Sequence, residues 1–158
     1  MTKELKLQFT LKIAQANKTQ LIVILYEMML VYIEEAKQAH ESADMEGFRL
    51  GIKRAKACLH ELMASLHFEY AISGNLLQLY TFADRQMTKA DVRKSVKELD
   101  FVKSMIEKLH AAYETVSAQD DSKPVMENTQ TVFAGLTYGR NQLTESLSDQ
   151  GSGRGFRV

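Results

Sequence analysis

The sequence predicts an all-α fold: an antiparallel four-helix bundle with an extended N-terminal arm and a partly irregular C-terminal tail. Residues 18–117 contain no proline, and glycine occurs there only at positions 47, 51 and 74, so little interrupts helix formation. Four segments of this stretch repeat apolar residues at helical spacing. Each apolar stripe must be buried, and short connections favour antiparallel neighbours. We therefore divide the 158-residue chain into an arm at 1–16, a bundle at 17–117, and a linker and tail at 118–158.

The first two helices of the predicted bundle have clear starting points. The first is expected from Asn17 to about Ser42, because Gln20 stands where it can complete a capping box with Asn17. The second opens at Asp44, a favourable N-cap residue. Its apolar stripe then follows at alternating spacings of four and three residues: Phe48, Ile52, Ala55, Leu59, Leu62 and Leu66.

The third and fourth helices are predicted from their stripes. The third is expected to begin near Ser73, and the fourth at Asp91, again a residue that favours the N-cap. The stripe of the third is Leu76, Leu79, Tyr80, Ala83 and Met87. The stripe of the fourth is Val92, Val96, Leu99, Val102, Ile106, Leu109, Tyr113 and Val116. From these stripes we predict five buried core residues: Leu59, Leu62, Leu66, Leu99 and Ile106.

Both flanks of the bundle have a different pattern. At the N-terminus, apolar residues occupy every second position from Leu5 to Ile13, and this period of two predicts an extended segment. We expect the arm to lie against the outer face of the first helix, or to pair with residues 132–138, which also alternate. The polar stretch 119–130 is typical of a linker, and residues 142–147 fit a short helix.

Composition and motifs argue against an enzyme, a metal protein and a nucleic-acid-binding protein. Lys plus Arg and Asp plus Glu both number 20, so the formal net charge is zero, whereas nucleic-acid-binding domains are usually basic. The single cysteine, Cys58, excludes a disulfide within the chain and a cysteine-based zinc site, and it fits a small core residue. The single Glu-x-x-His pair, Glu107 and His110, is expected on the solvated face rather than at a di-iron site. We predict no catalytic residue, no cofactor and no metal ligand.

No segment is predicted to enter a membrane. The N-terminus lacks the continuous apolar run of a signal peptide. The longest apolar stretch, residues 21–33, is interrupted by Glu27 and spans only about 20 Å as a helix, short of the ~30 Å hydrocarbon core. The sequence is therefore interpreted as that of a cytoplasmic protein.

The first helix is apolar nearly all round, which is more than a bundle helix needs. One face is able to point inward: Leu21, Leu25, Met28 and Tyr32. A second apolar face remains: Ile22, Met29, Ile33 and Ala36. Either the N-terminal arm or the C-terminal tail covers this second face, or it receives the amphipathic helix of a partner.

Three stretches, in chain order, resemble the flagellar export chaperone family, FliS. Residues 21–27 read Leu-Ile-Val-Ile-Leu-Tyr-Glu, like the family's opening helix. Residues 62–69 read Leu-Met-Ala-Ser-Leu-His-Phe-Glu, like the end of its second helix. Residues 75–80 read Asn-Leu-Leu-Gln-Leu-Tyr, like its third. The resemblance extends over residues 17–117.

The resemblance implies a binding module rather than a catalyst. Members of the family bind the disordered C-terminal segment of flagellin, which folds into helices on the chaperone. This binding prevents premature filament assembly and presents the subunit for secretion, so the implied partners are flagellin and the flagellar export apparatus. The alternative interpretation is a helical-bundle adaptor or structural protein that binds a different amphipathic-helix partner.

The client site that follows from this resemblance lies on the outer face of the first helix, with help from the third. The expected contact residues are Ile22, Leu25, Tyr26, Met29, Ile33, Asn75, Leu76, Leu79 and Tyr80. Tyr26 and Tyr80 are the expected anchors, because tyrosine combines a large contact area with a polar tip. We expect a charged residue at position 22 or 29 to abolish client binding and to leave the fold intact.

Overall fold

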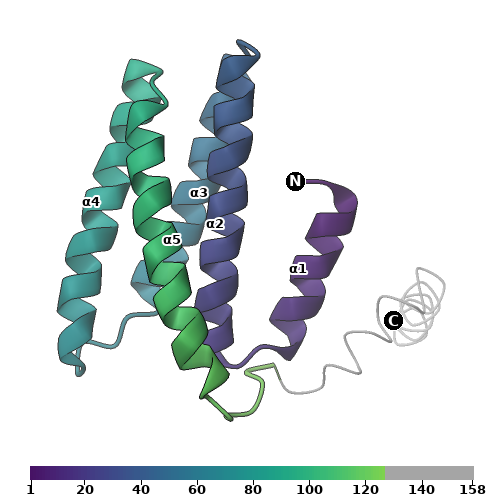
Figure 1. The fold of residues 1–158 in the computed structure, drawn as a ribbon, viewed down its shortest axis with the longest axis vertical. Helices are drawn as coiled ribbons and strands as arrows, with labels where there is room; N and C mark the ends of the chain where they lie inside the picture. Colours follow the sequence, from purple (N-terminus) through teal and green to yellow (C-terminus); the bar gives the residue numbers. More distant parts are fainter. Residues whose placement is uncertain (127–158) are drawn as a thin grey trace, which may run out of the picture.

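The computed structural model describes residues 1–126, and in this range the chain forms five helices and no strand (Figure 1). The helices are α1 (Lys3–Gln15), α2 (Lys18–Glu41), α3 (Met45–Ala64), α4 (Ala71–Arg93) and α5 (Lys97–Ala118). The predicted all-α class is confirmed, but the helix count is five. Among the residues described, no helix is both long and apolar enough to cross a membrane.

The four long helices, α2 to α5, run roughly along the long axis of the molecule, and α1 lies beside α2 (Figure 1). In this view the chain rises in α2, returns in α3, rises again in α4 and descends in α5. The most extensive packing is between α2 and α3, followed by that between α2 and α5. The helix α2 therefore occupies a central place, with partners on several sides.

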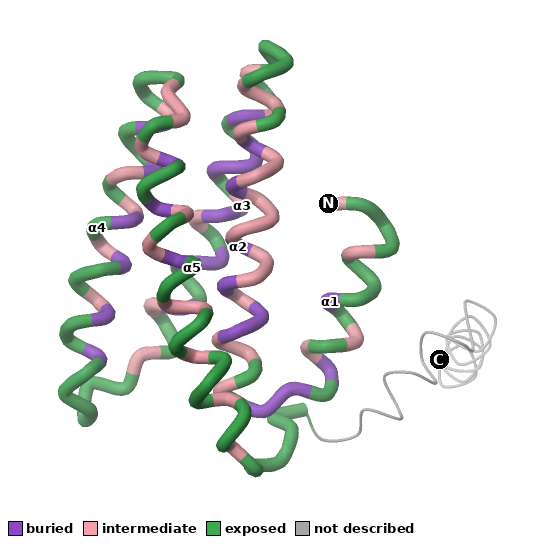
Figure 2. The backbone as a smooth tube through the Cα atoms, viewed as in Figure 1, coloured by how far each residue is buried: buried purple, intermediate pink, exposed green. Residues whose placement is uncertain are grey.

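The main core lies between α2, α3, α4 and α5 (Figure 2). Its fully buried large side chains are Tyr26, Met29, Ile33, Phe48, Leu59, Leu62, Tyr80, Met87, Leu99, Val102 and Ile106. The predictions for Leu59, Leu62, Leu99 and Ile106 are confirmed, whereas Leu66 lies beyond the end of α3 and is half-buried. Cys58 is buried in the same core, as predicted, and burial raises the pKa of its thiol to about 11.

The close packing of α2 on α3 depends on small residues. A Cβ atom added at Gly51 would lie 2.7 Å from the Cβ of Ala36, closer than real side chains approach. Both residues are fully or nearly fully buried, so the two helix backbones approach each other at this point. Gly51 costs the helix some conformational stability but permits this contact.

The predicted starts of α2 and α3 are confirmed. The side chain of Asn17 accepts a hydrogen bond from the backbone N–H of Gln20, and the side chain of Gln20 accepts one from the N–H of Asn17, each 2.9 Å long. This is a complete capping box. Asp44 caps α3 by accepting from the backbone N–H of Gly47 at 2.9 Å.

The predicted boundary between the last two helices is wrong. Asp91 does not start a helix, because α4 continues to Arg93 and α5 begins at Lys97. The turn is made at Lys94, which adopts a left-handed conformation with φ of 52°. A glycine usually marks such a helix end, and this sequence has none there. Val92, assigned to the stripe of the next helix, is 76% exposed.

The N-terminal segment is a helix, not the extended arm that its period-two pattern predicted. Leu5, Phe9 and Ile13 are four residues apart, so they share one face of a helix as well as one face of a strand. This face packs on α2, with Phe9 buried, while Leu7 is 55% exposed. The pattern therefore fits both a helix and a strand, and packing on α2 favours the helix. The pairing proposed with residues 132–138, and the short helix at 142–147, lie outside the residues that the structure describes.

Candidate functional site: an apolar groove beside α1

An open hollow of about 450 Å³ lies where α1, α2, the end of α3 and the segment after α5 meet. Its apolar lining residues are Ile13 of α1, Leu21, Ile22, Ile24 and Leu25 of α2, and Val125. Its polar lining residues are Lys18, Glu61, Ser65 and His67. We call this hollow the apolar groove. Its volume falls within the range of about 300–1,000 Å³ that is typical of binding sites.

The groove exists because α2 has two apolar faces, as the sequence predicted. One face of α2 packs into the main core, and the other contacts α1 through a smaller cluster. The buried members of this α1 cluster are Phe9, Ala16 and Ile24, and the partly buried ones include Leu5, Ile13, Leu21, Met28 and Val31. The helix α1 is shorter than α2 and covers only part of this face. The groove lies at the edge of that cover, where Leu21 and Ile24 of the α1 cluster meet Ile22 and Leu25, which pack against the main core.

The assignment of the two faces was inverted for α2. Tyr26, Met29 and Ile33 were expected on the outer face, but all three are fully buried in the main core. Helical periodicity gives two apolar faces of similar quality and does not say which one meets the larger core. The approach of Ala36 to Gly51 fixes the orientation, because the face that carries Ala36 must meet α3.

Tyr26 and Tyr80, expected as client anchors, instead contact each other inside the core. Their hydroxyl groups share a hydrogen bond that links α2 to α4, and the ring of Tyr113 lies 5.7 Å from that of Tyr26. Burial raises the pKa of Tyr26 above its ordinary value and raises that of Tyr80 to about 12. Two of the stretches that resemble the FliS family therefore meet through their tyrosines.

The remaining predicted residues are divided between three places. Ile22 and Leu25 line the apolar groove. Leu76 is buried in the main core. Asn75 is exposed on the first turns of α4. Leu79 is 39% exposed and lines a separate hollow of about 270 Å³ between α4 and α5, which it shares with Phe82 and Phe101.

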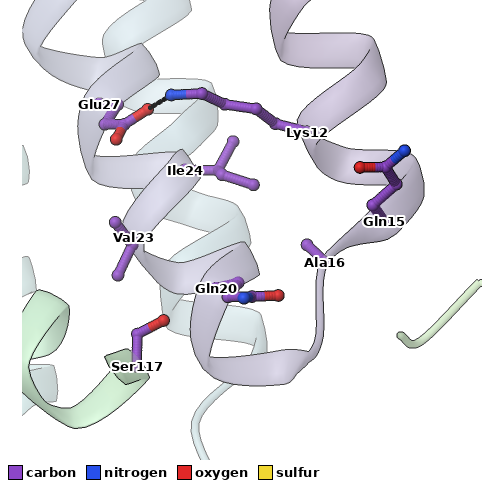
Figure 3. A pocket seen from close by; sticks show the side chains of 8 residues that line it. All are labelled: Lys12, Gln15, Ala16, Gln20, Val23, Ile24, Glu27 and Ser117. Carbon is purple, nitrogen blue, oxygen red and sulfur yellow. Dashed lines mark hydrogen bonds and ion pairs between the residues drawn. The ribbon is translucent and has the colours of Figure 1, made fainter. Parts of the chain in front are cut away.

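A second, more polar hollow of about 340 Å³ lies on the other side of α1 (Figure 3). Lys12 of α1 reaches across it and donates to the carboxylate of Glu27 on α2 at 2.7 Å. Ser117, near the end of α5, also lines it. Ile24 lines both this hollow and the apolar groove. The helix α1 thus rests on a narrow strip of α2, with open space on both sides.

One group of side chains in the described residues brings three potential metal-ligand atoms within 4.8 Å of one another: Glu27, His110 and Glu114. His110 Nε2 lies 3.6 Å from Glu27, and Nδ1 lies 3.7 Å from Glu114. The sequence placed His110 on the solvated face, but its side chain is mostly buried between α2 and α5. Lys12 already pairs with Glu27, so a metal cation would have to compete with an ammonium group.

The segment after α5 returns to the junction of α1 and α2, which the sequence did not predict. The amide of Asn17 donates to the carbonyl oxygens of Asp120 and Ser122, at 3.1 and 3.4 Å. The Thr19 hydroxyl donates to the Asp120 carboxylate. Hydrogen bonds from Ser122 and Thr19 lower the pKa of Asp120. The backbone N–H of Val125 then donates to the carbonyl of Ala16 at 3.0 Å, which places Val125 at the groove.

Sequence reasoning therefore missed several groove residues. Ile13 was assigned to an extended arm, Leu21 to the bundle interior, and Val125 to a linker. The available signals were the shared helical face of Leu5, Phe9 and Ile13, and the surplus apolar face of α2. No local pattern marks Val125, because its position depends on hydrogen bonds made more than a hundred residues away in the sequence.

The comparison with known families agrees with these observations. The family model of the flagellar protein FliS matches residues 1–120, which include all five helices. No curated protein matches the sequence. The match covers far more than half of the chain, and it includes α1 as well as the four long helices. The chain therefore belongs to the FliS family of flagellar proteins.

Proposed function

We propose that this protein is an export chaperone that binds the C-terminal segment of flagellin in the apolar groove, using Ile22 and Leu25 as contacts. Membership of the FliS family implies a role as a flagellar export chaperone, a class that is not known for enzymatic activity. The proposal adds the client segment and its place on this chain. We also propose that α2 to α5 form an antiparallel bundle. We further propose that the protein acts in the cytoplasm, where the client is made.

The observation that carries the proposal is an open groove with an apolar lining beside α1, which packs on α2 through a small cluster. Unpolymerised flagellin has apolar helical ends that would otherwise aggregate or assemble, and an apolar groove can hide such a surface. An amphipathic helix laid in this groove would place its apolar residues on Ile22, Leu25 and Ile13. An open hollow lies on each side of α1, so movement of α1 away from α2 would expose more of the apolar face of α2.

The other exposed members of the predicted site fit a long client. Leu79 and Asn75 lie on α4, away from the groove residues of α2, and Leu79 shares an apolar hollow with Phe82 and Phe101. We propose this hollow as a secondary contact for a client segment that extends over more than one face. The buried residues of the predicted site lie in the main core and are not proposed as contacts.

Calorimetry with a peptide of flagellin's C-terminal segment tests the proposal. Leu25→Glu should weaken binding at least tenfold, because it places a charge in an apolar wall without a partner. Leu25→Ala should weaken it less and serves to separate lost contact from introduced charge. Val92→Glu is the matched control, since it adds the same charge to an apolar residue that lies on the exposed end of α4. Circular dichroism must show that each variant keeps its helices.

Normal binding by folded Leu25→Glu protein would contradict the groove assignment. Equal loss of binding in the Val92→Glu control would also contradict it, because the effect would then be one of total charge. If neither the parent chain nor any variant binds the peptide, the assignment of this client is wrong.

A further inference from the structure

We propose that residues 128–138 of the same chain, here called the tail segment, occupy the apolar groove when no client is present. The groove would then be self-occupied, and a client would have to displace the tail segment. Competition with a client rests on the function proposed above. Occupation of the groove by the chain's own segment does not, and it is tested separately below.

Hydrogen bonds at the α1–α2 junction hold residues 120–125, the segment after α5, beside the groove. Asn17 holds the carbonyl oxygens of Asp120 and Ser122, and Val125 bonds to the carbonyl of Ala16. Val125 itself lines the groove, although it is 48% exposed and fills only part of it. The next residues of the chain therefore start at the groove itself rather than at a distant surface.

The tail segment has the chemistry that an apolar groove requires. From Asn128 to Gly139 the sequence contains no charged side chain, while charged residues stand on either side, at Glu127 and Arg140. Its apolar and aromatic residues are Val132, Phe133, Ala134, Leu136 and Tyr138. An uncharged segment loses little hydration energy in an apolar site, whereas a charged one would be penalised strongly.

Tethering makes even a weak interaction effective. The distance from Val125 to Val132 can reach at most ~25 Å in an extended chain, so chain length does not prevent the tail segment from lying in the groove. A short flexible tether gives an effective concentration on the order of millimolar. An interaction too weak to be seen between separate molecules would therefore still fill the groove within one chain.

Binding of an apolar fluorescent dye to the full-length chain is the first test. The double variant Phe133→Asp/Leu136→Asp should bind several times more dye than the parent, because the charged tail segment would leave the groove. The matched control is Leu143→Asp/Leu147→Asp, which adds the same charge farther along the chain and should behave like the parent. Equal dye binding by all three chains, or an equal rise in both variants, would overturn the proposal.

Photo-crosslinking identifies the occupant directly. A benzophenone amino acid at position 22 of the full-length chain should form crosslinks within the same molecule to residues 128–138, as mapped by mass spectrometry. The same probe at position 82, in the hollow between α4 and α5, should not. Crosslinks from position 22 that reach only other parts of the chain would overturn the proposal. Crosslinked dimers would also overturn it, since the occupant would then be a second copy.

Competition is measured with the flagellin peptide. The Phe133→Asp/Leu136→Asp chain should bind the peptide several times more tightly than the parent, whereas the control variant should bind as the parent does. If the peptide binds none of the chains, the proposed client is wrong, while the dye and crosslinking results still decide whether the tail segment occupies the groove.

Discussion

The two apolar clusters that meet on α2 differ in depth, although one helix supplies residues to both. In the main core, Tyr26, Met29 and Ile33 are fully buried and surrounded by α3, α4 and α5. In the α1 cluster, Phe9, Ala16 and Ile24 are buried where α1 alone packs on α2, and an open hollow lies on each side of this contact. The difference shows that one helix can be enclosed by three helices on one face and be covered by a single short helix on the other.

The energetic contrast follows from the number of buried side chains. Full burial of a large apolar side chain stabilises a fold by about 1.5–3 kcal/mol. Eleven large side chains are fully buried in the whole of the described chain, and all of them belong to the main core. The α1 cluster has two large buried residues, Phe9 and Ile24, and each keeps some exposure. Loss of α1 packing is therefore expected to leave the main core folded.

The largest expected effect comes from cavities in the main core. Leu62→Ala and Ile106→Ala should each lower the free energy of unfolding by ~2–5 kcal/mol, because the removed atoms are buried and the packed helices cannot close the space. Chemical denaturation followed by circular dichroism measures this change. Variants that unfold together with the parent would show that the main core is not what stabilises the protein.

The tyrosine pair should come next in size. Tyr26→Phe leaves the hydroxyl of Tyr80 buried without its partner, and the expected loss of stability is ~1–3 kcal/mol. The double variant Tyr26→Phe/Tyr80→Phe removes both polar groups and should cost less than the sum of the single changes. Tyr70→Phe is the control, because Tyr70 is 62% exposed. Additive effects of the two single changes would argue against a shared hydrogen bond.

A substitution in the α1 cluster should act locally. Phe9→Ala removes the largest buried side chain of α1, so the amide protons of α1 should exchange faster while those of α3 and α5 stay protected. Its effect on the global unfolding free energy should be smaller than that of Leu62→Ala. Binding of an apolar dye should increase, since α2 loses part of its cover. Equal loss of protection in all helices would show that α1 belongs to the same cooperative unit as the core.

The smallest effects are expected from the ion pairs of the two regions. Lys103 on α5 donates to Glu34 on α2 at 2.9 Å, and this hydrogen bond lowers the pKa of the Glu34 carboxyl. A lowered folded-state pKa means that the stabilisation is present above the ordinary pKa of glutamate and is lost as pH falls through the folded-state value. Both side chains are partly exposed, so Lys103→Gln should cost no more than about 1 kcal/mol at neutral pH.

Lys12→Gln provides the matching change in the other region. It breaks the ion pair with Glu27 and should speed amide exchange in α1 without a measurable change in the global free energy of unfolding.

The pH and salt dependence of Lys103→Gln tests the pair on α5 and α2. The difference in unfolding free energy between Lys103→Gln and the parent should shrink below the pKa of Glu34 and at high salt. A difference that grows on acidification would contradict the direction given for that pKa.

Much of the fold was predictable because its signals are local. The capping box of Asn17 and Gln20, the cap at Asp44 and the regular stripe of α3 are all written in neighbouring residues. The end of α4 was missed because Lys94 adopts a left-handed turn without a glycine. The conformation of residues 3–15 was missed because a spacing of four residues satisfies both helix and strand, and only packing on α2 decides between them.

The site was predictable only in part, and for a related reason. The surplus apolar face of α2 follows from its composition and led to Ile22, whereas Leu25 entered the predicted site with the family resemblance. Which face meets the core depends on the contact between Ala36 and Gly51, a pairing of two helices that no single segment reveals. Tyr26 and Tyr80 were mistaken for contacts because a tyrosine that anchors a partner and one that pairs inside a core look alike in a sequence.

Cys58 gives the molecule a reporter of its own interior. The only cysteine of the chain is buried in α3, and its pKa of about 11 leaves almost no thiolate at neutral pH. A thiol-specific reagent should therefore modify Cys58 mainly when the packing of the main core around α3 opens. The rate of alkylation would then report openings of the main core and not motions of α1, because Cys58 belongs to the main core and not to the α1 cluster. The chain without any substitution can therefore show whether only α1 moves or the main core opens as well.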